Sequence, residues 1–166
     1  MGRDELGDYI VSNGIDATIL DLDEPTPTVE AAAEVLGVSP AQIIKSILFL
    51  IKGGDGEFQP LMVITNGTDR IDYTALAKLL GTSRRSIRIA SAEQVEELTG
   101  FPVGTVPPFG HKSSLPTIID SRVVQQELIY GGGGALHALM RIAVSELQRV
   151  LPGARIEAVT QSTTTS

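Results

Sequence analysis

Cysteine and tryptophan are absent from this 166-residue chain, and only two histidines occur, His111 and His137. Without cysteine the chain can form no disulfide, offers no thiolate nucleophile and cannot build a cysteine-based zinc site. Two histidines are too few for a histidine-rich catalytic zinc site, so we expect no metal. Aromatic residues make up only 4% of the chain, which argues against binding single-stranded nucleic acid on an aromatic stacking platform.

Long hydrophobic runs are also missing. The longest, IIKSILFLI, is about half a membrane span and is interrupted by Lys45. The opening residues, MGRDELGDY, lack the basic and then apolar order of a signal peptide, and Leu6 stands where an acylation signal needs serine or threonine. We therefore expect a soluble cytoplasmic protein with no membrane partner.

Positive charge is in deficit, because the formal net charge is −7. This charge argues against a protein that coats nucleic acid non-specifically. The distribution is uneven: residues 1–34 contain nine acidic residues and one basic residue, whereas residues 70–122 contain seven basic and five acidic residues. A polyanion could dock on the second region while the remaining surface repels it, or these bases could be ordinary solvated side chains.

Hydrophobic periodicity and capping residues predict alternating helices and strands. We expect helices at residues 4–12, 29–36, 73–80, 92–100 and 145–151. We expect strands at residues 17–22, 46–51, 60–65, 86–90, 116–120, 127–130 and 136–142. Many connections are too short for a crossover helix, so some strand pairs must be antiparallel.

This order of elements predicts a single α/β domain of α+β type over residues 1–166. A chain with 42% hydrophobic residues can bury the core of such a domain. We expect a mixed, curved β-sheet or partial barrel surrounded by helices. The low-complexity tail, about residues 160–166, is expected to be mobile.

The glycine run at residues 131–134 raises the question of a nucleotide site. Leu136 stands where the dinucleotide fingerprint needs glycine or alanine, a strand is predicted after the run, and the chain contains no GxxxxGK[ST] motif. We therefore reject Rossmann and P-loop interpretations. The run is better explained as a turn that another part of the backbone approaches closely.

Lys45 is the most unusual residue on chemical grounds. Ser39, Pro40 and Gln42 have the pattern of a helix N-terminus and predict a short helix. Lys45 then lies between the end of this helix and the strand predicted from Ser46. Its stem could lie along the core while its ammonium reaches water. Alternatively, its charge could lie at the mouth of a pocket and stabilise an oxygen anion.

The segment VGTVPPFGHK, residues 103–112, is stiffened by two prolines and punctuated by two glycines. One interpretation is an ordinary surface turn. The other is a rigid wall whose glycines expose backbone N–H groups to a ligand. His111 could then be a base or a hydrogen-bonded surface histidine. No serine lies in a nucleophile elbow, and nothing in the chain suggests a Ser-His-Asp triad.

Three blocks give the chain a family resemblance: VEAAAEVLGVSPAQIIKSILFL, NGTDRIDYTALAKLLG and TGFPVGTVPPFGHKSSLPTIID. Their order and spacing resemble the YbaK/prolyl-tRNA synthetase-associated domain family over about Thr28 to Ile142. Members of this family are aminoacyl-tRNA deacylases that edit mischarged tRNA, in trans or as an inserted domain of prolyl-tRNA synthetase. Their fold, a mixed sheet or partial barrel with helices around it, is the one expected above.

The resemblance implies a site without a metal or other cofactor. Lys45 corresponds to the hallmark lysine of the family, and Gly104 begins the Gly-x-x-x-Pro loop that shapes the amino-acid pocket. We expect Lys45 and the Gly104 amide to be the catalytic groups. Asp120 is expected to be structural or to orient the pocket, and His111 is the protein candidate for a base. The expected substrate-binding residues are Ser46, Thr105, Val106, Pro107, Pro108, Gly110, His111 and Asp120.

The implied reaction is hydrolysis of the ester between a small or mid-sized amino acid and the terminal ribose of tRNA. Arg70, Arg84, Arg85 and Arg88 are the candidates for contacts with tRNA phosphates. Prolyl-tRNA synthetase or other translation factors are candidate partners, and a homodimer is left open. Two alternatives also stay open: a non-catalytic module that binds an aminoacyl group or tRNA acceptor end, and a hydrolase of a different small ester or amide.

Overall fold

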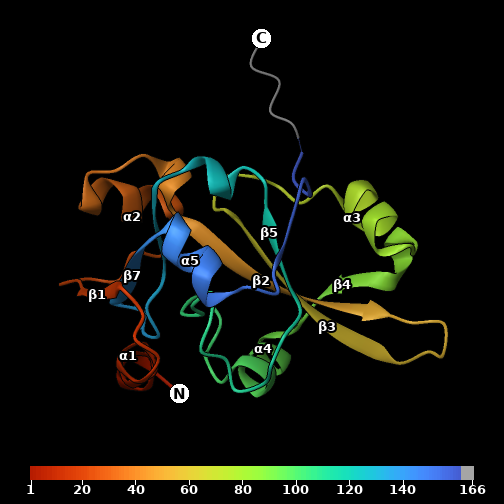
Figure 1. Cartoon of the computed structure of the whole chain (residues 1–166), viewed down its shortest axis with the longest axis horizontal. Helices are drawn as coiled ribbons and strands as arrows, with labels where there is room; N and C mark the ends of the chain where they lie inside the picture. Colours follow the sequence, from red (N-terminus) through yellow and green to blue (C-terminus); the bar gives the residue numbers. More distant parts are fainter. Residues whose placement is uncertain (162–166) are drawn as a thin grey trace, which may run out of the picture.

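The computed structural model describes residues 1–161 (Figure 1). The α-helices in this range are α1 (Arg3–Ser12), α2 (Val29–Leu36), α3 (Tyr73–Leu80), α4 (Ala92–Thr99) and α5 (Val144–Val150). The strands are β1 (Ala17–Asp21), β2 (Ile44–Lys52), β3 (Phe58–Asn66), β4 (Ile87–Ile89), β5 (Thr117–Asp120), β6 (Leu128–Gly132), β7 (Ala138–Ala143) and β8 (Arg155–Glu157). Short 3-10 helices occur at Pro40–Gln42, Arg84–Ser86 and Val123–Gln125.

The strands form two sheets. β1, β7 and β6 make an antiparallel three-stranded sheet, and the other strands make a five-stranded sheet in the order β4-β2-β3-β5-β8. β4, β2 and β3 are antiparallel, whereas β5 and β8 run parallel to β3 and to each other. The expected mixed, curved sheet with helices around it is therefore confirmed, although the described strands divide into two sheets that form no closed barrel (Figure 1).

A parallel bridge between Ile43 and Tyr130 brings β6 alongside the start of β2. This bridge joins the edge of the smaller sheet to the larger one, so the two sheets curve into one structure. The contact matters for function because β2 carries Lys45 and β6 ends in the glycine run.

Side chains alternate along β2 and β3, and this alternation gives the five-stranded sheet two faces. On one face Leu48 and Met62 join the main core, to which α1, α4 and α5 also contribute. On the other face Phe49 and Val63 pack with Leu76 of α3. We call these the main-core face and the α3 face. Lys45 has the parity of Phe49 and therefore lies on the α3 face.

Capping side chains begin the helices beside these strands. The Thr28 hydroxyl accepts a hydrogen bond from Ala31 N at 3.0 Å and starts α2, and the Asp72 carboxylate accepts one from Ala75 N at 3.0 Å and starts α3. α2 ends at Gly37, whose φ of 69° lies in the left-handed region that glycine adopts without strain.

Two predicted strand boundaries were wrong in an informative way. β2 begins at Ile44, not at Ser46, because the 3-10 helix at Pro40–Gln42 ends early enough for Ile44 to pair with Asn66. Lys45 therefore lies within the strand and not at its entrance. β3 begins at Phe58, so Pro60 lies inside the strand and not at its start, opposite Leu50 of β2. The pairing of β3 with β5 begins only at Met62. The N–H that Pro60 lacks therefore interrupts no hydrogen bonding with β5.

β8 was missed altogether, because Arg155–Glu157 has too few apolar residues to predict a strand. It forms through parallel pairing with β5. Of the tail expected to be mobile, Thr160 and Gln161 are described and are hydrogen bonded, Gln161 N to Arg70 O at 2.8 Å. Residues 162–166 lie outside the described range. No helix within residues 1–161 is long and apolar enough to cross a bilayer.

The interpretation of the glycine run as a close approach is confirmed. A Cβ on Gly132 would lie within 3.0 Å of the backbone of Thr105 and Val106, and one on Gly134 within 3.0 Å of the backbone of Arg3. Gly134 N also donates to Thr105 O at 3.0 Å. The run therefore lets the Pro/Gly loop lie directly against the end of β6.

Candidate active site around Lys45

Lys45 is an exposed cation in a strand whose other residues, apart from Lys52 at its end, are buried or half-buried. It lies opposite Thr65 of β3, with the apolar side chains of Ile43 and Ile47 two positions away on the same face. Within residues 1–161 its ammonium forms no ion pair and no hydrogen bond. All three of its N–H donors are therefore available to a ligand.

The register between β2 and β6 relates Lys45 to the Pro/Gly loop. Ile43 bridges Tyr130 in parallel, so Lys45 and Gly132 each lie two residues beyond the bridged pair. On Gly132, the space that a side chain would fill is occupied by the Val106 carbonyl. The loop thus lies against the end of β6 at the level of Lys45 on β2.

The front of the loop offers backbone donors. Gly104 is exposed, and its φ of 88° is a left-handed conformation that a residue with a side chain rarely adopts. Thr105 N and the Thr105 hydroxyl both donate to Pro102 O, at 3.1 and 2.7 Å, which closes the turn. The N–H groups of Gly104 and Val106 meet no acceptor within the described chain, and that of Gly104, which is exposed, can bind a ligand oxygen.

The back of the loop is anchored in the protein. Val106 and Phe109 belong to the main core. Pro108 lies beside Gly131, which also contacts Ile44, and Gly110 lies against the ring of Tyr9. This packing leaves the loop little freedom to move, because its buried half is held by several elements. The packing is consistent with a stiff loop, and its role as the wall of a pocket stays a prediction.

His111 braces the loop from behind. Its Nε2 lies 2.7 Å from Pro107 O, and in the neutral ring this nitrogen donates to the carbonyl. Burial lowers the pKa of His111, and the hydrogen bond to Pro107 opposes this shift. The neutral imidazole is therefore favoured, with one of its two nitrogens already engaged.

Two further predicted residues point elsewhere. Ser46 alternates with Lys45 and lies on the main-core face, opposite Ile64. Asp120 is fully buried, and its carboxylate accepts hydrogen bonds from the backbone N–H groups of Arg122, Val159 and Thr160 and from the Thr160 hydroxyl, at 2.9–3.1 Å. These bonds attach the C-terminal segment to β5, which fits the expectation of a structural role.

The four predicted tRNA-binding arginines fall into two groups. Arg70 is exposed on the turn after β3, at the end of the sheet where Lys45 lies. Arg88 pairs with Leu50, which lies five residues, or about 17 Å, along β2 from Lys45. Its guanidinium stacks 4.1 Å above the ring of Phe58, on the main-core face.

Arg84 and Arg85 are exposed in the 3-10 helix just before β4. They lie near Arg88, at the end of β2 away from Lys45. The structure therefore places Lys45 at the level of the strand end against which the loop lies, with Arg70 at the same end of the sheet. It separates them from the group formed by Arg84, Arg85 and Arg88.

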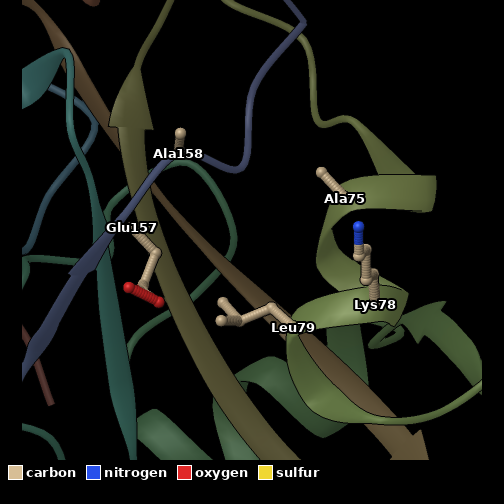
Figure 2. Close-up of a pocket in the computed structure, with 5 residues that line it drawn as sticks. All are labelled: Ala75, Lys78, Leu79, Glu157 and Ala158. Atoms are coloured by element: carbon tan, nitrogen blue, oxygen red, sulfur yellow. The ribbon is translucent and has the colours of Figure 1, made fainter.

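Two surface depressions in the described chain have linings that do not include Lys45. One, of about 440 Å³, lies between α3 and β8, where Leu79 projects from the helix toward the strand that carries Glu157 (Figure 2). The other, of about 620 Å³, is lined by three glutamates of α4 and by Lys112. Its carboxylates would repel the phosphates of a nucleic acid.

The sequence interpretation missed Thr65. This residue is fully buried, lies directly opposite Lys45, and has a hydroxyl with no hydrogen-bond partner in residues 1–161. The only signal in the sequence was a polar residue at the end of the apolar run PLMVIT. Nothing in the sequence alone paired it with Lys45.

Comparison with known proteins defines the class. The family model of the aminoacyl-tRNA editing domain matches residues 23–150, most of the chain. The match includes Lys45 and the whole Pro/Gly loop. The chain therefore belongs to the aminoacyl-tRNA editing domain family, which confirms the resemblance drawn from the three sequence blocks.

Among curated relatives, the proline–tRNA ligase of Limosilactobacillus fermentum is 35% identical over 96 residues, which are 58% of this chain and 16% of the ligase. The chain thus spans about a sixth of these longer enzymes. The uncharacterized protein YwhH of Bacillus subtilis is 27% identical over 129 residues, 78% of each protein.

Solved structures share the fold over nearly the whole chain. A crystal structure of a proposed trans-editing enzyme for prolyl tRNA synthetase matches with a TM-score of 0.84 and 29% identity, covering 96% of this chain and 97% of the other. The hypothetical protein APE2540 matches with a TM-score of 0.82 and 30% identity, covering 95% and 99%.

Proposed function

We propose that this chain is an aminoacyl-tRNA deacylase that acts in trans, hydrolysing the ester between a wrongly attached amino acid and the terminal ribose of tRNA. The observation that carries the proposal is the placement of an unpaired lysine, Lys45, at the level where the loop beginning at Gly104 meets β6. Membership of the editing-domain family supports the same reaction.

The proposed chemistry needs few groups because an aminoacyl ester is already activated. Attack of water on the ester carbon places negative charge on the carbonyl oxygen, and donors aimed at that oxygen lower the barrier. Lys45 supplies a positive charge, and the exposed amide of Gly104 supplies a neutral donor. The rigid loop holds this amide in place before the substrate arrives, which reduces the reorganisation that the reaction requires.

His111 is better placed to support the loop than to accept a proton from water, because its Nε2 is engaged by Pro107 O. We therefore infer that the water is activated by a group of the substrate, such as a ribose hydroxyl. Asp120 contributes by fixing β5 and the C-terminal segment beside β3.

The proposed tRNA contact begins at Arg70, near the ester. The group formed by Arg84, Arg85 and Arg88 lies about 17 Å farther along β2, which corresponds to roughly five nucleotides of one strand at 3.4 Å per nucleotide. These arginines would then contact phosphates beyond the single-stranded end. Prolyl-tRNA synthetase is a candidate partner because the matching region of the relatives belongs to that enzyme.

The test is to incubate the purified chain with a panel of mischarged tRNAs and to measure release of free amino acid. Release by the wild type and its loss in Lys45→Ala would support the proposal. Binding without release would instead identify a non-catalytic module. Neither binding nor release would point to a different small ester or amide as substrate.

A further inference from the structure

Thr65 has a buried hydroxyl that the fold leaves without a partner. Its residue is fully buried, and its Oγ1 accepts and donates no hydrogen bond within the described chain. A buried polar group without a partner is unfavourable, and native proteins seldom retain one without a reason. Thr99, which is equally buried, shows the usual arrangement: its hydroxyl bonds Val95 O, Phe101 O and Phe101 N at 2.7–3.1 Å.

The sheet register limits which side chains could satisfy the Thr65 hydroxyl. Lys45 lies directly opposite on β2, and Asp120 occupies the corresponding position on β5, one residue beyond the pair of Ile64 with Ile119. The same-face residues before and after Thr65 on its own chain are Val63, which is apolar, and Gly67, which has no side chain. The immediate neighbours of Thr65 in this row, Lys45 and Asp120, both bring polar groups, and Glu157 on β8 follows Asp120 one strand farther away.

Asp120 is already occupied. Both of its carboxylate oxygens accept hydrogen bonds from Val159, Thr160 or Arg122. Lys45 is the opposite case, because its ammonium has no partner in residues 1–161. Residues directly opposite on antiparallel strands have Cβ atoms about 4.5–5.5 Å apart, which is within reach of a four-carbon lysine stem.

Building on the proposed function, we propose that Thr65 is a positioning residue for Lys45. When the ester is bound, the Thr65 hydroxyl oxygen accepts one hydrogen bond from the Lys45 ammonium. The Asp120 carboxylate, one strand farther in the same row, draws the cation toward Thr65. The two remaining N–H donors of Lys45 are then held toward the ester oxygen.

A hydroxyl suits this task better than a carboxylate would. It orients the ammonium but carries no charge, so the full positive charge remains available to the developing oxyanion. A flexible lysine without an anchor would spread its charge over many rotamers. The expected effect therefore falls on the chemical step and not on substrate binding.

The test compares Thr65→Val, which keeps the shape and removes the hydroxyl, with Thr65→Ser, which keeps the hydroxyl. With a mischarged tRNA that the wild type deacylates, Thr65→Val should lower kcat about tenfold and leave KM within about twofold. Thr65→Ser should stay within about threefold of the wild type. In a Lys45→Ala background, adding Thr65→Val should cause no further loss, because the hydroxyl acts through the lysine.

Thermal unfolding separates this role from a structural one. Thr65→Val should not lower Tm, since it removes an unsatisfied group, whereas Thr99→Val should lower Tm by several degrees because it breaks bonds that exist. The role of Thr65 would be overturned, with the proposed function left intact, by either of two results. One is a wild-type kcat in Thr65→Val. The other is that Thr65→Val lowers kcat as much in the Lys45→Ala background as in the wild type. Equal rates for the wild type and Lys45→Ala would overturn the proposed function as well.

Discussion

Lys45 combines two properties that seldom occur together: a position inside a mostly buried strand and a charge without a partner. The first property follows from the sequence, where the lysine interrupts an apolar run. The second depends on the fold, because Thr65 lies directly opposite Lys45 and the nearest carboxylate of this row, Asp120, lies one strand farther and is hydrogen bonded to other groups. A structural lysine would be expected to have such a partner or to lie wholly at the surface.

Lys45→Ala should lower kcat for deacylation by about 10²–10³, the usual effect of removing one donor to a developing oxyanion. Steady-state deacylation assays measure this change, and circular dichroism would show that the variant keeps its fold. Lys52→Ala is the matched control, since Lys52 is also exposed on β2 but lies seven residues, about 23 Å, away. A similar loss in both variants would contradict a specific role for Lys45.

His111 predicts a pH dependence of stability. Burial lowers its pKa in the folded state, so on acidification the unfolded chain binds a proton first. The free energy of unfolding should therefore fall as the pH drops below the ordinary histidine pKa of about 6.5, and this contribution should level off below the lowered pKa.

Denaturant unfolding at pH 5 to 8 measures this dependence. His111→Gln can still donate to Pro107 O but cannot titrate, so its stability should decline less on acidification than that of the wild type. Parallel curves for the two proteins would show that His111 does not contribute. At pH 7.5, a deacylation rate of folded His111→Gln close to that of the wild type would agree with a supporting role for His111.

At the scale of elements, the site depends on close contact between a loop and a strand end. β6 ends in glycines because the backbone at Thr105 and Val106 occupies the space that side chains would fill. The contact holds the loop at the level of Lys45. A side chain at this point would push the loop away from β6, and the amides of Gly104 and Val106 would move with it.

Gly132→Ala should therefore lower the free energy of unfolding by about 1–3 kcal/mol through overpacking and should also reduce kcat. Gly153→Ala is the control, since a Cβ there would meet no atom within 4 Å. Its stability should change by less than about 1 kcal/mol. Denaturant unfolding and deacylation assays on both variants test the difference, and wild-type behaviour of Gly132→Ala would contradict the contact.

At the scale of the whole molecule, charge is segregated. The chain is acidic overall, yet Arg84, Arg85 and Arg88 are all exposed at one end of β2. An acidic protein that binds tRNA needs such a local basic region, because repulsion elsewhere on its surface restricts how the polyanion can approach. In the proposed complex, this arrangement would place the acylated end of tRNA toward Lys45.

Reversing Arg84 or Arg85 to glutamate should weaken tRNA binding and reduce the slope of log affinity against log salt by about 1 for each phosphate that is no longer neutralised. Fluorescence anisotropy across a salt series measures both quantities. Arg141→Glu is the control, because it makes the same change of net charge at an exposed position on β7 of the other sheet. Equal effects at both positions would indicate a general charge effect and exclude a defined interaction with the phosphates.

The sequence by itself determined most of the elements and singled out Lys45 as the principal candidate for a site residue. Periodicity, capping residues and glycine stops are local signals, so α2, α3 and α4 could be predicted almost to the residue. Lys45 stood out because a charge inside an apolar run is visible without a fold. The three sequence blocks then indicated the family.

Only the tertiary structure decided which residues meet. Strand register is a long-range property, set by pairing between segments far apart in the chain, and it placed Thr65 opposite Lys45 and Gly132 at the level of the lysine. The same pairing created β8, whose own residues carry too little signal. It also separated Lys45 from Ser46, because adjacent residues of a strand point to opposite faces of the sheet.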